Sequence, residues 1–138
     1  MIKQAVSPAK GLILAMAAMM LASGQALASP RSCSDAEAKQ AVFKAAERTR
    51  GNYVKLLQKQ GREAWAKVTE VYQIETLRKD AGTGRVECFA KAKIESNWGA
   101  LAQPVWATYT LGNYDDGTAY SDVHVLSADE RQRFSRGR

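Results

Sequence analysis

The sequence predicts an α+β fold in which an N-terminal helix packs on a roughly four-stranded antiparallel meander, held by one disulfide. Three observations support this prediction. A helical apolar pattern follows residue 34, short alternating segments separated by turn signals fill the rest of the chain, and there are two cysteines. The helix and the sheet each have one apolar face, and the simplest way to bury both is to lay the helix on the sheet.

The first 28 residues are typical of a secretory signal peptide. Lys3 and Lys10 provide a positive start, and the apolar run at 11–22 is shorter than the roughly 20 residues that span a bilayer. The sequence Ala26-Leu27-Ala28 is an A-x-A cleavage site. We therefore expect cleavage after Ala28 and a periplasmic or secreted protein, and neither an uncleaved membrane anchor nor a lipoprotein.

Length and charge narrow the class of protein. Removal of residues 1–28 from the 138-residue chain leaves about 110 residues, enough for one core. We expect one domain over 29–127 and a polar, basic tail over 128–138. The formal net charge of +6 falls to about +4 without the signal peptide. This excess favours solubility and weak attraction to anionic surfaces, and no RRM, KH or helix-turn-helix pattern points to nucleic acid.

The helix is predicted to begin at a capping box, with Ser34 as N-cap and Glu37 at the third helical position. Gly51-Asn52 predicts a kink or a break, and Gly61 predicts the end. The buried stripe repeats every three to four residues: Ala38, Val42, Ala45, Ala46, Thr49, Tyr53, Leu56 and Leu57. The opposite face is mostly basic: Lys39, Glu47, Arg48, Arg50, Lys55 and Lys59.

Two strands are predicted next, at 67–78 and 85–96, with a turn at 80–84 between them. The first strand alternates imperfectly, so the sequence leaves its facing open. The second alternates clearly, and Phe89 is the one apolar residue on its charged side. This pattern is typical of a half-buried antiparallel strand. Its apolar side consists of Val86, Cys88, Ala90, Ala92 and Ile94.

A last hairpin is predicted from residues 105–114 and 118–126, and its register can be chosen from the side-chain pattern. A three-residue loop with Gly117 in the left-handed conformation places Tyr109 opposite Val123 and Ala107 opposite Val125. A two-residue loop would mix polar and apolar residues on one face. We therefore expect the three-residue loop.

The two cysteines are expected to form one disulfide, Cys33–Cys88. An even pair in an exported protein favours a disulfide, and neither cysteine has a C-x-x-C partner that would indicate a reactive thiol. Closing about 55 residues stabilises the fold by about 4 kcal/mol in the chain-entropy model. The bond would join the start of the helix to the sheet.

One helix followed by four strands resembles the cystatin-like and NTF2-like rolls at the level of architecture. The Gln-x-Val-x-Gly loop of the cystatins is absent, and the chain is short for the three helices of an NTF2-like domain. The resemblance therefore implies a roll and carries over no functional residue.

No catalytic constellation, metal site or cofactor is predicted. His124 is the only histidine, and Ser121 lies on the opposite face of the same strand, so the two do not suggest a triad. Asp115-Asp116 fits a hairpin turn and lacks the spacing of a calcium loop. The glutamates are expected on a solvated sheet face. If the chain is an enzyme, Tyr72 or Tyr109 would act with a carboxylate in the mouth of the roll.

The candidate binding surface is an aromatic patch of Phe89, Trp98 and Trp106 on the outer sheet face, unless the C-terminal segment with Phe134 covers it. We therefore expect a small exported binding or accessory protein that contacts an envelope protein. A sharper version is an inhibitor or immunity-type protein. Two alternatives stay open: a small enzyme or ligand binder with a pocket in the roll, and a weak binder of polyanions through the basic helix face and tail.

Overall fold

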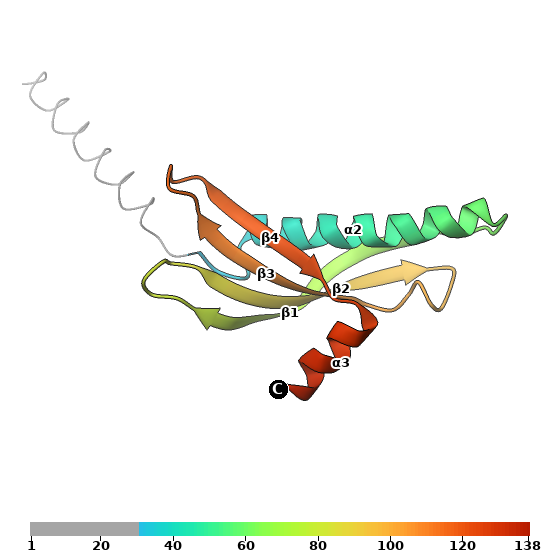
Figure 1. The fold of residues 1–138 in the computed structure, drawn as a ribbon. Helices are drawn as coiled ribbons and strands as arrows, with labels where there is room; N and C mark the ends of the chain where they lie inside the picture. The colour runs from blue at the N-terminus through green and yellow to red at the C-terminus, as the bar shows by residue number, and fades with distance from the viewer. Residues whose placement is uncertain (1–30) are drawn as a thin grey trace, which may run out of the picture. The chain divides into compact units, whose positions relative to one another are not determined.

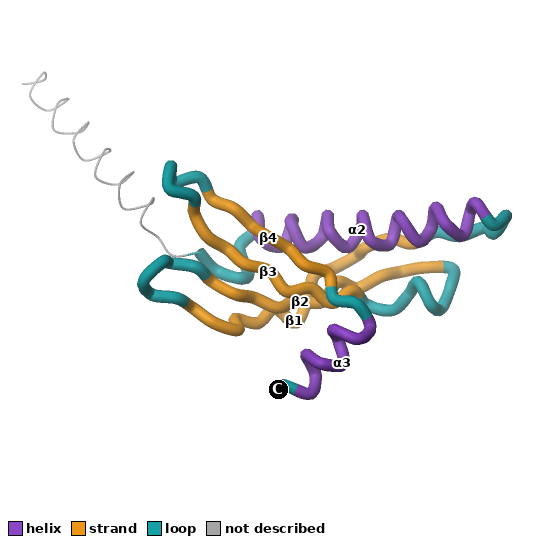
Figure 2. The backbone as a smooth tube through the Cα atoms, in the orientation of Figure 1, coloured by secondary structure: helices purple, strands orange, loops and turns teal. Residues whose placement is uncertain are grey.

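A long helix lies along one face of a four-stranded sheet, and a short helix follows the last strand (Figures 1 and 2). This computed structural model describes residues 31–138, so the predicted signal peptide at 1–28 lies outside the described residues. All neighbouring strands pair antiparallel in chain order, which confirms the predicted fold class. The elements are α2 (Ala36–Lys59), β1 (Ala66–Lys79), β2 (Val86–Ser96), β3 (Val105–Asn113), β4 (Ala119–Val125) and α3 (Ala128–Arg136).

Helix α2 begins later than predicted, and the capping box at Ser34 and Glu37 is wrong. The N-cap is Asp35, whose side chain makes no capping hydrogen bond to the helix. Its carboxylate instead accepts a hydrogen bond from the Ser32 N–H at 3.0 Å. The Asp35 N–H donates to the Ser32 carbonyl at 3.1 Å. The chain therefore makes a turn around Cys33 before it enters the helix.

Two further predictions concern the middle and the end of α2. The helix runs unbroken through Gly51, because the intrinsic cost of one glycine is only about 1 kcal/mol and the flanking turns hold. Gly61 ends the helix as predicted, with a φ of +77°. The Arg62 N–H donates to the Leu57 carbonyl and the Gly61 N–H to the Gln58 carbonyl, which is a Schellman motif.

The imperfect alternation of β1 has a structural cause. Its pairing with β2 shifts register three times, between Val68 and Glu70, between Tyr72 and Glu75, and between Thr76 and Arg78. Each irregularity changes which side chains point to the core. Gln73 lies within one of them and has a φ of +49°. Such bulges also make this edge strand a poor template for pairing with another chain.

The hairpin of β3 and β4 has the predicted register. Tyr109 pairs with Val123 and Ala107 with Val125. The Gly117 N–H donates to the Tyr114 carbonyl at 2.9 Å, and Gly117 has a φ of +87°. This is a turn followed by a left-handed glycine, as the side-chain pattern predicts.

The disulfide fixes the start of α2 to the centre of the sheet. Cys33 and Cys88 are bonded, with their Cα atoms 5.7 Å apart, and both are buried. The Tyr109 hydroxyl donates to the Cys33 carbonyl at 2.8 Å, from the next strand. The predicted pairing and its structural role are therefore confirmed.

Small residues let α2 approach the sheet closely. Ala38 and Ala46 on the helix, and Ala90 and Ala92 on β2, are completely buried. The sheet buries side chains of only the first half of the helix, since no residue of α2 beyond Ala46 is buried. In the second half, where the sequence predicts a continuing buried stripe, Tyr53 is 55% exposed.

Residues 128–136, within the segment expected to be a polar tail, form α3. Ser127 is its N-cap in a capping box with Glu130. Phe134 stacks on Phe89, with ring centroids 4.6 Å apart, on the sheet face opposite α2. No helix within residues 31–138 combines the length and apolar character needed to cross a membrane.

Candidate anion-binding groove

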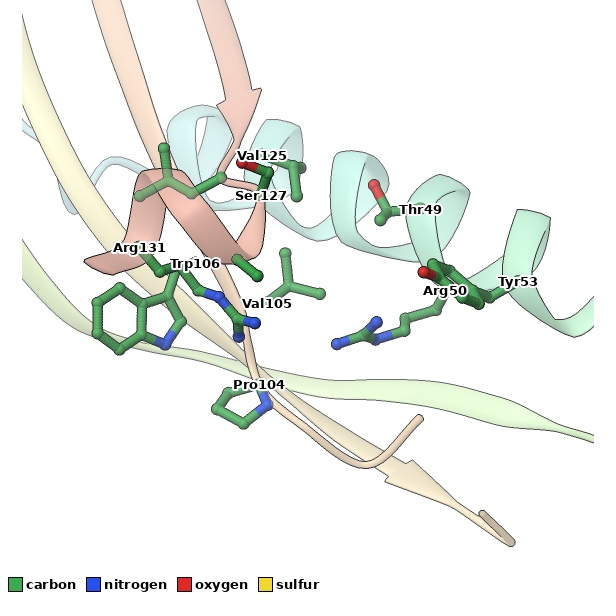
Figure 3. A pocket seen from close by; sticks show the side chains of 11 residues that line it. Thr49, Arg50, Tyr53, Pro104, Val105, Trp106, Val125, Ser127 and Arg131 are labelled. Atoms are coloured by element: carbon green, nitrogen blue, oxygen red, sulfur yellow. The ribbon is translucent and has the colours of Figure 1, made fainter. Parts of the chain in front are cut away.

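A cavity of about 480 Å³ lies beside the middle of α2, where β3 begins and β4 ends (Figure 3). Three parts of the chain meet there: the middle of α2, the start of β3, and the junction between β4 and α3. The end of β4 leads into α3 at Ser127, which brings the start of α3 to the same cavity. Its wall includes Thr49, Arg50, Tyr53, Val105, Trp106, Val125 and Arg131.

Two arginines from different helices point toward each other across this cavity. Arg50 comes from α2 and Arg131 from α3 (Figure 3). Burial lowers the pKa of Arg50, and the positive charge of Arg131 lowers it further. Both effects act against the charged form of Arg50. The guanidinium nevertheless stays protonated at neutral pH, so the cavity holds two repelling cations.

The Arg50 side chain is held in place by a backbone carbonyl, which carries no net charge. Its Nη2 donates to the Gln103 carbonyl at 2.6 Å. Its Nε is buried and has no hydrogen-bond partner among the described residues. A buried donor without a partner costs free energy, and a backbone carbonyl does not neutralise the charge. The side chain is thus positioned but its charge is uncompensated.

Among residues 31–138, no acid lines this cavity. The ion pairs within residues 31–138 join Arg31 to Glu37, His124 to Glu130, and Arg138 to Glu75, and none includes Arg50 or Arg131. Glu130 is adjacent to Arg131 in the sequence, but its carboxylate lies 2.6 Å from His124 Nε2 and accepts from the Ser127 N–H at 3.0 Å. The carboxylate that could have neutralised Arg131 is therefore engaged elsewhere.

A second cavity, of about 410 Å³, continues along α2. It shares Arg50, Tyr53 and Arg131 with the first, so the two adjoin. It adds Leu57, Arg62, Trp98 and Leu101, and no acid of the described part of the chain lines it. The Arg62 guanidinium lies 5.0 Å from the centre of the Trp98 ring. We refer to the two adjoining cavities, lined by Arg50, Arg62 and Arg131, as the arginine groove.

The three aromatic residues of the predicted binding surface do not form one exposed patch. Phe89 is only 2% exposed, because Phe134 of α3 covers it and Trp106 meets it edge-on at 5.6 Å. Trp106 also lines the first cavity, whereas Trp98 lines the second. The tryptophans therefore mark the two parts of the groove, and Phe89 anchors α3.

The other residues considered for chemistry lie elsewhere. His124 is exposed and pairs with Glu130, whose pKa falls to about 2 through hydrogen bonds from His124 and Ser127. Tyr109 is buried, which raises its pKa to about 12, and its hydroxyl donates a hydrogen bond to the Cys33 carbonyl. Asp116 accepts from the Thr118 N–H within the hairpin turn. Residues 31–138 contain no cluster of His, Cys, Asp and Glu suited to a metal ion.

Sequence reasoning missed the groove for a reason that differs between its two central arginines. The charge pattern of the sequence places Arg50 on the solvated helix face. Arg50 is nonetheless spaced three and seven residues from Tyr53 and Leu57, which places all three on one side of the helix. That signal was present in the sequence. Arg131 had no such signal, because its position depends on where α3 docks.

Comparisons of this chain with protein-family models, with curated proteins and with solved structures find no match.

Proposed function

We propose that this chain is a small exported binding protein that engages an anionic region of an envelope protein through the arginine groove. The observation that carries the proposal is the pair of arginines, Arg50 and Arg131, which face each other across an open cavity with no acid in its wall. A ligand anion placed between them would relieve their repulsion and accept hydrogen bonds from both guanidiniums.

The arrangement is better suited to binding than to stability. Arginines that stabilise a fold are paired with carboxylates, as Arg138 is with Glu75 in this molecule. Arg50 and Arg131 instead carry an electrostatic cost that only an external counter-charge removes. Both are partly buried, so their attraction to an anion is screened by salt less than that of the exposed arginines.

Export is part of the proposal and rests on the residues at 1–28 and on the disulfide. A disulfide persists in oxidising compartments such as the periplasm and the extracellular space. The expected mature protein begins at Ser29. Mass spectrometry of protein recovered from the envelope fraction should give the mass of residues 29–138 with one disulfide, whereas a full-length mass would contradict cleavage.

The binding test is a capture experiment on the full chain, expressed with its own N-terminus and a C-terminal tag on a flexible linker. Envelope extracts are passed over the wild-type protein and the variants Arg50→Gln and Arg131→Gln, at low and at high salt. Arg48→Gln and Arg133→Gln serve as matched controls, because they remove the same charge from the same helices at exposed positions outside the groove.

We expect one stoichiometric partner that the wild-type protein and both controls retain and that the two groove variants lose. An inhibitor or immunity-type role would be supported if that partner is an enzyme whose activity falls on binding. Equal capture by all five proteins, or capture of only salt-labile polyanions, would contradict the proposal.

A further inference from the structure

We infer that the groove accepts an acidic segment of a protein partner, in which an apolar side chain lies between two carboxylates. This inference rests on the proposed function and specifies its ligand. It follows from the positions of the three arginines, from the apolar side chains between them, and from the cations that already lie over the two tryptophan rings.

The cations lie at two places along the groove. Arg50 and Arg131 lie where the two cavities adjoin, and Arg62 belongs to the second cavity alone. Arg50 and Leu57 are seven residues apart on one side of α2, which corresponds to about 10 Å along the helix. Arg62 follows the end of the helix, beyond Leu57. A ligand along the groove therefore meets positive charge at the arginine pair and again at Arg62.

The stretch between these cations is apolar. It contains Tyr53 and Leu57 of α2, with Leu101 of the β2–β3 connection in the same wall. Tyr53 is 55% exposed, and Leu57 is partly exposed. This is the half of the amphipathic stripe that the sheet leaves uncovered. Contiguous exposed apolar side chains beside a polar rim are typical of sites that bind other proteins.

The tryptophans are poorly placed to stack against sugars or bases. Arg62 lies over the Trp98 ring, and Lys91 Nζ lies 4.5 Å from the centre of the Trp106 ring. Glycans and single-stranded nucleic acids need free aromatic faces for stacking. A protein segment has no such need, because Asp and Glu carboxylates match the guanidinium fork directly.

A membrane surface also fits less well than a segment of chain. Arg50 is half-buried, bonded to the Gln103 carbonyl, and recessed between α2 and α3. A narrow extended segment can enter such a recess, whereas a flat headgroup layer meets the outermost cations first. An extended chain rises about 3.3 Å per residue, so roughly three residues cover the distance from Arg50 to Leu57, and Arg62 lies further along the groove. We therefore expect two acids separated by at least two residues, with an apolar residue between them.

The test is a selection from a random peptide display library on the immobilised full chain, followed by affinity measurements with the enriched peptides made synthetically. The expected consensus has Asp or Glu on both sides of an apolar residue. Arg50→Gln and Arg131→Gln should each weaken the selected peptide by about tenfold or more, because each removes a charge-assisted hydrogen bond. Arg48→Gln and Arg133→Gln should change the affinity by less than about twofold.

The apolar part of the inference has its own measurement. Replacement of the central apolar residue of the peptide by Ala should weaken binding to the wild-type protein. It should weaken binding to Tyr53→Ala much less, because that variant lacks the surface which the apolar residue contacts. Circular dichroism of Tyr53→Ala verifies that the fold is retained, as expected for a side chain more than half exposed.

Several results would overturn the inference. They are a consensus without acids, peptide binding that is unaffected by Arg50→Gln and Arg131→Gln, and tighter groove-dependent binding to heparin fragments or to phosphatidylglycerol vesicles than to any selected peptide. Groove-dependent capture of an envelope protein, combined with no acidic consensus, would retain the proposed function and reject only this ligand. Loss of groove-dependent capture would reject the proposed function itself.

Discussion

At the scale of single residues, the aromatic side chain opposite Gly112 leaves no room for a larger residue at this position. Gly112 of β3 pairs with Tyr120 of β4, and a Cβ built on Gly112 would lie 2.4 Å from the Tyr120 hydroxyl oxygen. The Tyr120 ring also packs on Tyr114, at 4.9 Å between centroids. Gly112→Ala should therefore push the ring away and lower the free energy of unfolding by about 1–3 kcal/mol, as measured by urea denaturation.

Gly99→Ala is the matched control for this substitution. A Cβ on Gly99 meets nothing within 4 Å, and its φ is not in the left-handed region, so stability should change little. Tyr120→Ala supplies a second check. In that background Gly112→Ala should cost far less, and an unchanged cost would show that the ring is not the reason.

Glu130 should give the C-terminal helix a defined acid dependence. Hydrogen bonds from His124 and Ser127 hold the pKa of Glu130 at about 2, below its ordinary value near 4.5. Because the folded value is the lower one, the contribution of the ionised carboxylate is complete above about pH 4.5 and is lost as the pH falls toward about 2. Tryptophan fluorescence, reporting on Trp106, should show α3 loosening in this window.

The variant Glu130→Gln tests the assignment. It removes the titrating group, so it should loosen α3 at neutral pH and abolish the additional change between about pH 4.5 and 2. Asp129→Asn is a suitable control, since Asp129 is exposed and its carboxylate takes part in no ion pair among the described residues. An identical acid transition in Glu130→Gln would assign it to another group.

At the scale of elements, α3 depends on one aromatic anchor. No residue of α3 is buried, and Phe134 is the side chain that stacks on Phe89 and lies near Trp106. Loss of these contacts should cost about 1–2 kcal/mol of docking free energy, or about tenfold in the undocked population. Phe134→Ala should therefore speed limited tryptic cleavage at Arg131, Arg133 and Arg136 by about tenfold.

The exposed neighbour Gln132 provides the comparison, and Gln132→Ala should be cleaved at the wild-type rate. If Phe134→Ala is also cleaved no faster than the wild-type protein, α3 is held by something other than the aromatic stack. Because Arg131 belongs to α3, undocking should also weaken the affinity of any ligand of the arginine groove.

Elements were predictable from the sequence where the local pattern was strong. The register of β3 and β4 followed from the need to place Tyr109, Val123 and their neighbours on one face, and a shift of one residue would have inverted that face. The start of α2 was misplaced because the turn around Cys33 engages Asp35. Helix α3 was missed although Ser127 and Glu130 form a capping box, because its arginine-rich composition favours a solvated tail.

At the scale of the whole molecule, stability should depend strongly on the disulfide. Cys33 and Cys88 are 55 residues apart, and loss of their bond should cost about 4 kcal/mol in the chain-entropy model. The double variant Cys33→Ala, Cys88→Ala should therefore unfold at a much lower urea concentration. Reduction of the wild-type protein should produce a similar shift, and reductant should have no effect on the variant.

The candidate site belongs to this same scale, which explains why it was only partly predictable. The disulfide followed from the presence of two cysteines in a chain expected to be exported. The groove requires α2 to pass the start of β3 and the end of β4, and α3 to bring Arg131 opposite Arg50. Both conditions depend on contacts between distant segments. The sequence identified Trp98 and Trp106, which line the groove, but grouped them with the buried Phe89 in one exposed patch.

The order of the strands has a consequence for how the chain can fold over time. Each strand pairs with the strand that precedes it, and both cysteines lie before β3. A chain that emerges amino-terminus first can therefore oxidise Cys33 and Cys88 when only α2, β1 and β2 are available. The last two strands then extend a sheet that is already closed onto its helix, and the arginine groove forms last, when α3 docks.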